Sequence, residues 1–273
     1  MSRSPRAEPH APLPSIAPTA ELRAAVAQAY DVFARFPEPR FPLGVCLACC
    51  VSPEIERELR QWKLPALTAH HLYEYNASAK PMQQSVAELG HLLPRMLDLI
   101  AAGEEVHHST ELFLSRLGNC PVGSWRVDEQ AVLDRFAAAL FEVALRGEPL
   151  TDGARHWPED PLATLLMFDV AGLSIDPLLA RWQQCEQVAA ATWFVESAYW
   201  KFCEDETYSN PFATDRPAFQ RRLRDWLRDP ACRRDFAAKL LAPAFQDVAQ
   251  THVADGRMPF LLMVDAVFDY LAS

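Results

Sequence analysis

Three cysteines within five residues have the clearest chemistry in this chain. Cys46, Cys49 and Cys50 form the sequence C-x-x-C-C, and the adjacent histidines His70 and His71 follow in the next segment. Thiolate sulfur and imidazole nitrogen are ligands that zinc prefers in proteins. The pattern therefore indicates a zinc site, structural or catalytic, that would use Cys46, Cys49 and a histidine.

The number of ligands argues against such a site. A structural zinc site needs four ligands, and the sequence has no second C-x-x-C to supply another pair. Neighbouring side chains on a helix point about 100° apart, so His70 and His71 are not expected to bind one ion together. The cysteines would equally fill a tight loop as small apolar side chains, or supply a reactive thiol. We therefore predict no stoichiometric zinc in the purified protein.

A polar turn interrupts an otherwise apolar helical pattern later in the chain. The sequence from Glu88 to Leu99 reads E-L-G-H-L-L-P-R-M-L-D-L. His91 and Arg95 are one helical turn apart in it, on either side of Pro94. Histidine and arginine are uncommon on an apolar helix face, so both side chains need polar partners.

Acidic residues that would satisfy this turn come further along. Glu111 precedes a leucine, and Trp125 and Glu129 enclose the sequence W-R-V-D-E. We expect His91 and Arg95 to contact an acidic residue such as Glu111 or Glu129, in an internal network that fixes how the helices pack. The simpler interpretation of His91 is a core or boundary histidine whose hydrogen bonds are satisfied.

The order of these motifs resembles a bacterial family of uncharacterised all-helical proteins. The family has an early C-x-x-C, a leucine-rich helix pair, H-x-L-P-R-x-L-x-L, an acidic residue before a leucine, and W-x-x-x-E. The matching positions here, all after residue 20, are Cys46 and Cys49, Leu64 to Tyr75, His91 to Leu99, Glu111, Trp125, Glu129 and the W-L-R-D-P from Trp226. Glu88 departs from the aspartate that the resemblance leads us to expect. The resemblance implies an all-helical fold and no particular activity.

Three other pairs repeat the carboxylate and histidine spacing of di-iron bundles. They are Glu88 with His91, Glu104 with His107, and Glu105 with His108. Di-iron sites also need glutamates from two further long helices, and the last two pairs fall in a polar connection. We therefore interpret these pairs as ordinary polar residues.

Composition narrows the classes of function. The chain has 273 residues, is 50% hydrophobic and carries a formal net charge of -10, which opposes binding to nucleic acid and to anionic membranes. Sequences typical of hydrolases and nucleotide-binding enzymes, such as G-x-S-x-G and G-x-x-x-x-G-K-[ST], are missing. Seven cysteines, an odd number, suit reduced thiols and a cytoplasmic protein.

Helical signals run through the sequence. Glycines number 9 against 22 prolines, and apolar residues recur at spacings of three and four. We predict a first helix over 19–36, a helix capped by Ser52, and another capped by Thr68. An amphipathic helix is predicted over 128–147, with an inner face formed by Leu133, Phe136, Leu140 and Val143. A long helix is predicted from Asp176 to about Glu204.

The chain divides at a run of turn-forming residues. We predict a disordered proline-rich tail over 1–18, an N-terminal helical half over 19–147, a connection over 148–160 and a C-terminal helical half over 161–273. The apolar segment 259–271 is expected to pack inside the second half.

These patterns predict an all-α protein, a layered bundle or irregular array of about ten helices in two packed halves. Acidic helical surfaces suit a basic protein partner. The first hypothesis is therefore a non-enzymatic intracellular interaction or adaptor protein, for example a bacterial immunity protein that binds a basic toxin. The alternative hypothesis is a zinc-binding protein, with or without a catalytic role, that uses Cys46, Cys49 and a histidine.

Overall fold

The computed structural model describes five segments of the chain, residues 19–40, 42–147, 160–201, 206–252 and 258–273. Over these segments the chain forms twelve α-helices and four short 3-10 turns, with no strand. The predicted all-α class is confirmed, with twelve α-helices described against the expected ten or so. The predicted tail over 1–18 lies outside the described residues, as does the predicted connection except for Asp160.

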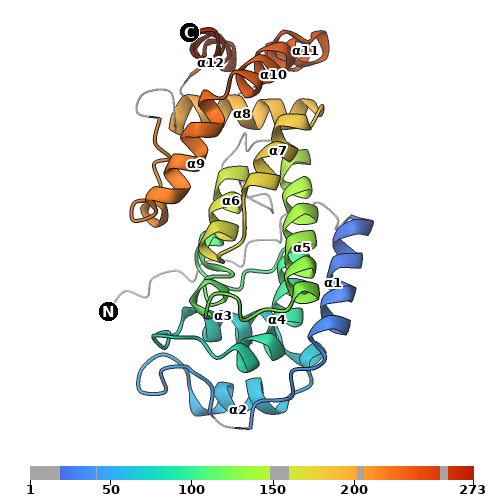
Figure 1. Ribbon diagram of the computed structural model, residues 1–273, viewed down its shortest axis with the longest axis vertical. Coiled ribbons are helices and arrows are strands. Elements are labelled where there is room, and N and C mark those ends of the chain that lie inside the picture. The colour runs from blue at the N-terminus through green and yellow to red at the C-terminus, as the bar shows by residue number, and fades with distance from the viewer. Residues whose placement is uncertain (1–18, 41, 148–159, 202–205, 253–257) are drawn as a thin grey trace, which may run out of the picture.

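The helices follow one another along an elongated molecule (Figure 1). The first part of the chain holds α1 (Ala20–Phe33), α2 (Pro53–Gln61), η1 (Leu64–Ala66), α3 (Ala69–Ala77), α4 (Val86–Ala101), η2 (Thr110–Leu112), η3 (Leu117–Asn119) and α5 (Val127–Arg146). The second part holds α6 (Pro161–Val170), α7 (Asp176–Gln184), α8 (Val188–Lys201), η4 (Pro211–Ala213), α9 (Pro217–Arg228), α10 (Pro230–Leu241), α11 (Pro243–Thr251) and α12 (Phe260–Ala272).

Local capping explains where several helices begin. Ser52 accepts a hydrogen bond from the backbone N–H of Ile55 at the start of α2, and Pro53 is the first helical residue. At the start of α3, the N–H of Thr68 donates to Nδ1 of His71 (3.2 Å). Helices α2, α6, α7, α9, α10 and α11 all have proline in their first two positions, where its missing N–H loses no helical bond. The helix starts predicted after Ser52 and Thr68 are confirmed.

The core is built around α5. Its predicted inner face, formed by Leu133, Phe136, Leu140 and Val143, is buried. Helix α1 packs against α4 and α5, and α5 also contacts α6, α7 and α8. One continuous cluster of buried apolar side chains therefore extends through both parts of the described chain. The predicted division into two packed halves is not confirmed.

The middle of the molecule joins segments that are distant in sequence. Turn η2 packs on α6, and Asn210 donates to Oε1 of Glu111 (2.6 Å). Arg216 donates to the side chain and to the carbonyl oxygen of Asp169, both at 2.6 Å. The contacts of η2 position the segment between α4 and α5 against the second part of the chain, and the bonds of Arg216 join α6 to the start of α9.

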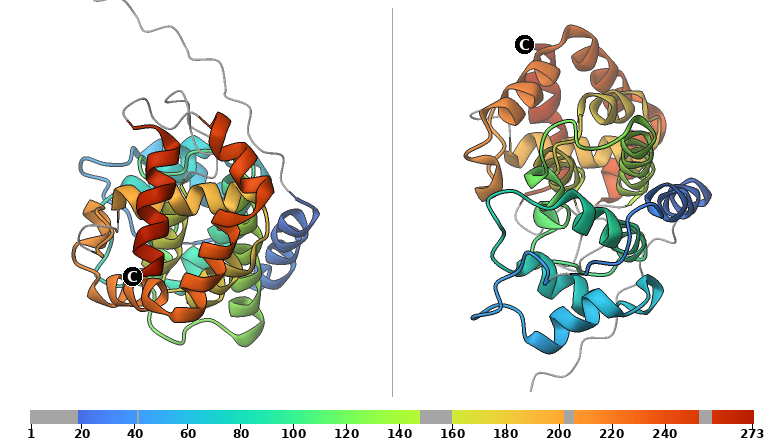
Figure 2. Two further views of the ribbon diagram at one scale, coloured as in Figure 1. Left: turned by 90° about the horizontal axis from the view of Figure 1, so that it is seen from above. Right: turned by 60° about the horizontal axis from the view of Figure 1, so that its bottom comes forward.

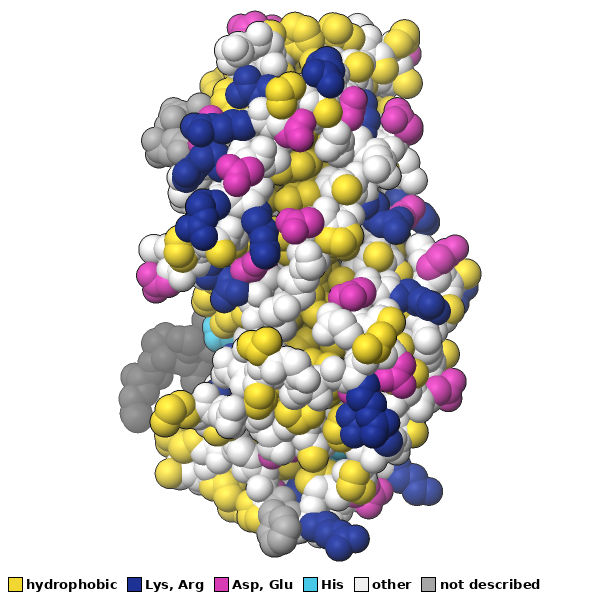
Figure 3. Space-filling model, in the orientation of Figure 1, with side chains coloured by type: hydrophobic (Ala, Val, Ile, Leu, Met, Phe, Trp, Pro, Cys, Tyr) yellow, Lys and Arg dark blue, Asp and Glu magenta, His cyan; other side chains and the backbone are white. Residues whose placement is uncertain are grey.

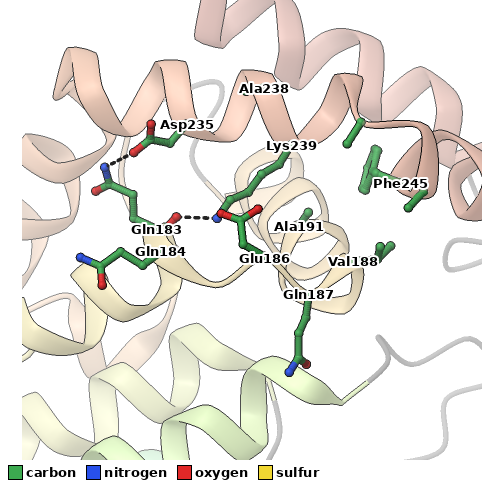
Figure 4. A pocket seen from close by; sticks show the side chains of 12 residues that line it. Gln183, Gln184, Glu186, Gln187, Val188, Ala191, Asp235, Ala238, Lys239 and Phe245 are labelled. Carbon is green, nitrogen blue, oxygen red and sulfur yellow. Dashed lines mark hydrogen bonds between the residues drawn. The ribbon is translucent and has the colours of Figure 1, made fainter.

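The long helix predicted from Asp176 to about Glu204 is wrong, because the chain leaves the helical path between α7 and α8. At the end of α7, Lys239 of α10 donates to the carbonyl oxygen of Gln183 (Figure 4). It also donates to the carbonyl oxygen of Cys185 (2.7 Å). These bonds satisfy carbonyl groups that a continuous helix would have bonded internally. The break borders a pocket of about 440 Å³ between α7, α8, α10 and α11.

The last helix is only partly enclosed. Phe260, Met263 and Val267 are buried, whereas Leu261 and Leu262 are 41% and 52% exposed. Figure 2 shows α12 crossing over α8 at this end of the molecule. The expectation that segment 259–271 packs inside is therefore wrong for one of its faces, because α8, α10 and α11 cover only the other.

Candidate functional site

The three clustered cysteines meet on the loop between α1 and α2. The Sγ atoms of Cys46 and Cys49 are 3.5 Å apart, and those of Cys49 and Cys50 are 3.6 Å apart. All three sulfur atoms lie within 4.8 Å of one another. A disulfide bond is about 2.05 Å long, so these cysteines are free thiols. Among the described residues, they form the one group of three or more His, Cys, Asp or Glu side chains whose ligand atoms lie close enough together to hold a metal ion.

The predicted histidine ligands lie elsewhere. Nε2 of His71 hydrogen bonds to Glu58 (3.0 Å), and its Nδ1 hydrogen bonds to the hydroxyl of Thr68 (2.8 Å). His70 lies beside Glu74 on the same helix, at 3.9 Å. Neither histidine of this pair joins the cysteine cluster. Glu58 of α2 and Thr68 at the start of α3 occupy both nitrogens of His71, which is why the predicted histidine ligand is wrong. The glutamate and histidine pairs considered for di-iron do not form a metal-holding group in the described chain either.

The cysteine cluster perturbs the acidity of its own thiols. A hydrogen bond from the backbone N–H of Cys49 to the sulfur of Cys46 lowers the pKa of Cys46 to about 7, and the N–H of Ala48 acts in the same direction. Hydrogen bonds to the sulfurs of Cys46 and Cys50 raise the pKa of Cys49 to about 11. The cluster therefore holds one thiolate near neutral pH beside a thiol that keeps its proton.

Cys46 should be the cysteine that iodoacetamide modifies first. The thiolate is the nucleophile, so its rate of alkylation should rise with pH and reach half its maximum near pH 7. Burial raises the pKa of Cys120 and of Cys232 to about 12, and these should react much more slowly. Mass spectrometry of peptides after brief alkylation measures each site. Faster modification of Cys232 than of Cys46 would contradict this assignment.

The loop that carries the cysteines, residues 44–50, is called the thiol loop below. Its first residue is held on both sides: the N–H of Gly44 donates to Oε2 of Glu88 (2.9 Å), and its carbonyl oxygen accepts from Nη1 of Arg116 (3.2 Å). The N–H of Cys46 donates to the hydroxyl of Ser78 (2.8 Å). The backbone is therefore fixed where the loop begins, while Cys49 and Cys50 are exposed.

Beneath the thiol loop lies a set of buried polar side chains, Tyr75, Gln84, Glu88 and Arg116, called the buried network below. Oε1 of Glu88 accepts from the hydroxyl of Tyr75 (2.7 Å) and from Nε2 of Gln84 (3.0 Å). Nη1 of Arg116 donates to Oε1 of Gln84 (2.8 Å). The guanidinium group lies 4.0 Å from the centre of the Tyr75 ring. A carboxylate and a guanidinium group are thus joined through neutral side chains.

Arg116 is completely buried, at 0% exposure. Its Nε donates to the carbonyl oxygen of Tyr75 (2.9 Å), and Nη2 donates to the carbonyl oxygens of Tyr75 and Ser78. Burial lowers the pKa of Arg116 and raises the pKa of Tyr75 well above its ordinary value. Tyr75 therefore remains a neutral donor to Glu88.

The sequence predicts little of the buried network. Glu88 stands out by its departure from the expected aspartate, whereas no motif marks Tyr75, Gln84 or Arg116 as a site residue. One signal was available for Arg116, which stands among apolar residues in F-L-S-R-L. An arginine within such a run must find partners inside the protein when its neighbours are buried.

The predicted polar cluster does not form as one group. His91 hydrogen bonds through Nδ1 to the carbonyl oxygen of Phe36 (3.3 Å). Arg95 donates to Oδ2 of Asp98 (2.5 Å) and to the carbonyl oxygen of Leu67 (2.8 Å). The expected contact of His91 and Arg95 with Glu111 or Glu129 is therefore wrong, because Arg95 finds nearer partners. Nε2 of His91 is buried without a hydrogen-bond partner among the described residues, so the interpretation of His91 as a histidine with satisfied hydrogen bonds holds for Nδ1 alone.

The remaining members of that predicted cluster have separate roles. Glu129 is 0% exposed, accepts from Arg35 and accepts from the N–H of Arg126 (2.8 Å) at the start of α5. Trp125 packs edge-on against Phe33, with ring centres 5.7 Å apart. Glu111 accepts a hydrogen bond from Asn210, the residue before η4. His91, Trp125 and Glu129 therefore all contact Arg35 or Phe36 just after α1, whereas Arg95 and Glu111 bond to other partners.

Arg95→Ala should lower the free energy of unfolding by about 1 kcal/mol. Asp98 is 37% exposed and also accepts from the hydroxyl of Tyr30 (3.2 Å), so the substitution leaves no isolated buried charge. Unfolding in urea measures the change, and the exposed Arg135→Ala serves as the control. A loss above about 3 kcal/mol would instead indicate a buried charge left without its partner.

Comparison of the chain with protein-family models, with curated proteins and with solved structures gave no match in any of the three. The family resemblance inferred from the order of the motifs stays an expectation, and the function must be argued from the site. None of the described helices combines the length and the apolar character needed to cross a membrane.

Proposed function

We propose that this protein binds a thiophilic metal cation, such as zinc or copper(I), through the thiolates of Cys46, Cys49 and Cys50. The spacing of the sulfur atoms carries the proposal. In a tetrahedral site with zinc–sulfur bonds of about 2.3 Å, neighbouring sulfurs lie about 3.8 Å apart. The Sγ distances of 3.5 and 3.6 Å are close to that value, so small side-chain rotations suffice to bind an ion.

The surroundings of the cluster suit a cation that exchanges. Three thiolates leave one position of a tetrahedral ion open to water or to another ligand. Cys49 and Cys50 are exposed, so an ion reaches them from solvent without opening the core. Soft thiolate ligands favour zinc and copper(I) over hard cations such as magnesium.

The fold supports this role by positioning the loop. The buried network holds both polar groups of Gly44, and Ser78 holds the N–H of Cys46. The backbone therefore does not need to be ordered again when an ion binds, which reduces the entropy cost of binding. A location in the reducing cytoplasm is part of the proposal, because free thiols persist there.

Titration of the reduced protein with zinc, in competition with a chromophoric chelator, tests the proposal. We expect one ion per chain. Replacement of any of the three cysteines by serine should weaken binding by more than about 100-fold, since loss of outer-shell partners alone costs 10- to 100-fold. Cys185→Ser, which alters a half-buried cysteine outside the thiol loop, should bind zinc as the wild type does.

Two results would reject this function. One is the absence of saturable zinc binding when a thiol assay shows that the cysteines are reduced. The other is equal affinity in Cys49→Ser and Cys185→Ser, which would place the bound ion elsewhere. A parallel titration with copper(I) shows which of the two cations the cluster prefers.

We also propose a second function, the binding of a basic protein partner, as expected for an adaptor or an immunity protein. It is supported by the net charge of -10 and by large exposed apolar side chains on α10, α11 and α12. These side chains are Leu241, Val248, Leu261 and Leu262. Figure 3 shows hydrophobic side chains gathered at this end of the molecule. Exposed apolar patches of this kind often mark protein interaction sites.

A basic toxin encoded beside the gene for this protein would provide the test. Co-expression should protect the host cell, and Leu241→Glu combined with Leu262→Glu should abolish protection without unfolding the protein. Val122→Glu changes a fully exposed apolar side chain between η3 and α5 and should leave protection intact. Full protection by the double variant would contradict the proposed surface.

A further inference from the structure

The thiol loop brings two of its cysteines close enough to bond to each other. The Sγ atoms of Cys46 and Cys49 are 3.5 Å apart, whereas the sulfurs of a disulfide are about 2.05 Å apart. Rotation about the Cα–Cβ bonds is the ordinary way in which a side chain changes position, and a gap of about 1.5 Å lies within its range. The two sulfurs can therefore approach bonding distance while the backbone stays in place.

The backbone of the loop has a shape that suits a disulfide between these two residues. The carbonyl oxygen of Cys46 accepts hydrogen bonds from the N–H groups of Cys50 (3.2 Å) and Val51 (3.0 Å), so the chain turns back on itself here. The first and last residues of a four-residue turn have Cα atoms less than about 7 Å apart. Disulfides join Cα atoms about 4.4–6.8 Å apart. Cys46 and Cys49, the ends of such a turn, therefore have a suitable spacing.

The second close pair, Cys49 and Cys50, does not suit a disulfide, although its sulfurs are only 3.6 Å apart. Consecutive Cα atoms across a trans peptide bond are about 3.8 Å apart. This spacing is below the usual lower limit of about 4.4 Å for residues that a disulfide joins, so a bond between neighbours would distort the peptide group. Oxidation should therefore select Cys46 and Cys49 and leave Cys50 as a free thiol.

Small molecules in solution can reach the selected pair. Cys49 is exposed and Cys46 is half-buried, whereas Cys232 is 0% exposed. The buried network holds Gly44, and Ser78 holds the N–H of Cys46. These bonds involve no cysteine side chain, so they are available whether the two sulfurs are reduced or joined. The loop can therefore pass between the two states without unfolding.

We propose that the thiol loop is a site of reversible oxidation, where hydrogen peroxide converts Cys46 and Cys49 into a disulfide and thereby releases the bound metal ion. The release rests on the metal-binding function proposed above, but the oxidation does not. Sulfurs joined in a disulfide are no longer thiolates, which are the form that binds a metal ion. The ion would lose two of its three sulfur ligands and keep only Cys50.

The oxidation takes two steps. One sulfur of the pair, as the thiolate, attacks an oxygen of hydrogen peroxide; the O–O bond breaks, hydroxide leaves, and the sulfur becomes a sulfenic acid. The other sulfur then attacks the sulfenic sulfur, so that the S–S bond forms and the S–O bond breaks. The hydroxyl group leaves as water with the proton of the second thiol. In total, two thiols lose two electrons and two protons, and peroxide becomes two water molecules.

Mass spectrometry of the full-length, metal-free protein tests the oxidation. Reduced protein is treated with hydrogen peroxide, then with iodoacetamide, and is digested with trypsin. We expect the number of titratable thiols to fall by two per chain. The tryptic peptide that ends at Arg57 should carry a disulfide between Cys46 and Cys49 and an alkylated Cys50. Dithiothreitol should restore both thiols.

Two matched serine variants separate the roles of the exposed cysteines. Cys50→Ser should form the disulfide at a rate within about twofold of the wild type, because the bonding pair is intact. Cys49→Ser should lose thiols at least about tenfold more slowly, because it lacks one sulfur of that pair. Circular dichroism checks that both variants fold. The proposal is overturned if peroxide removes no thiols, if Cys50 is part of the disulfide, or if folded Cys49→Ser loses two thiols as fast as the wild type.

Zinc release is measured separately, with protein that has bound zinc and a chromophoric chelator too weak to remove zinc from the reduced form. We expect peroxide to release zinc in step with the disulfide, and Cys185→Ser to behave as the wild type does. Zinc that stays bound after the disulfide has formed would overturn the release. Disulfide formation in a protein that never binds zinc would reject the metal function and the release with it. Zinc binding without disulfide formation would reject the oxidation and leave the metal function standing.

Discussion

Arg116→Met should lower the free energy of unfolding by about 3–5 kcal/mol, the usual cost of removing one partner from a buried charged network. Methionine fills much of the space but donates no hydrogen bond. The change would leave Oε1 of Gln84 and the carbonyl oxygens of Gly44 and Tyr75 without this donor. It would also leave the carboxylate of Glu88 without a nearby positive charge. Unfolding in urea, followed by circular dichroism, measures the loss.

Arg181→Met is the matched control. Arg181 is 46% exposed and pairs with Glu142 at the surface (2.6 Å), so its loss should cost less than about 1 kcal/mol. Arg116 also bonds to Gly44, the first residue of the thiol loop. The Arg116→Met variant should therefore have a more mobile loop, and its Cys49 should be alkylated faster than in the wild type. A loss for Arg116→Met no larger than that for Arg181→Met would show that the buried network contributes little to stability.

Gly118→Ala should lower the free energy of unfolding by about 3 kcal/mol. A Cβ atom at this position would overlap the carbonyl oxygen of Val170 and approach the backbone of Ala171. These neighbours are backbone atoms at the end of α6, and they cannot rotate away as a side chain can. Turn η3 and α6 would have to separate where the two parts of the chain meet. Thermal and urea unfolding both measure the effect.

Gly123→Ala separates steric overlap from other effects of losing glycine. Gly123 has a φ of +76° and no atom within 4 Å of a Cβ placed there. Its substitution should therefore cost only the left-handed backbone strain, about 1 kcal/mol. Equal losses for Gly118→Ala and Gly123→Ala would argue that the contact with Val170 is unimportant.

The parts of the fold that the sequence predicts correctly depend on neighbouring residues. Ser52 and Pro53 define the start of α2 within a few positions, and Thr68 does the same for α3. The spacing of Leu133 and Phe136 identifies the inner face of α5. Such signals are local, because capping bonds and helical periodicity act over one or two turns.

The errors come from contacts between distant residues. Lys239 satisfies carbonyl groups at the end of α7 from a position 54 to 56 residues further along the chain, and no local pattern near α7 indicates this. Arg116 finds Tyr75 41 residues earlier and Gly44 72 residues earlier. Residue spacing cannot reveal that these segments meet.

The candidate site shows the same division. The cysteine cluster was identified because its members are adjacent in sequence. The histidine ligand was wrong because His71 is also a good local partner for Thr68 and for Glu58. Gln84 and Arg116 have no such local signal, since they come together only when the segment between α3 and α4 lies against the turn after η2.

The indirect link between Glu88 and Arg116 has a consequence for the response of the protein to salt. Dissolved ions weaken exposed charge pairs, with a screening length of about 8 Å at physiological ionic strength, but they do not enter a packed interior. Surface pairs such as Arg181 with Glu142 should therefore lose strength in concentrated salt. The backbone N–H and carbonyl oxygen of Gly44 bond to the two buried charged groups. The thiol loop should therefore keep its shape from dilute buffer to concentrated salt.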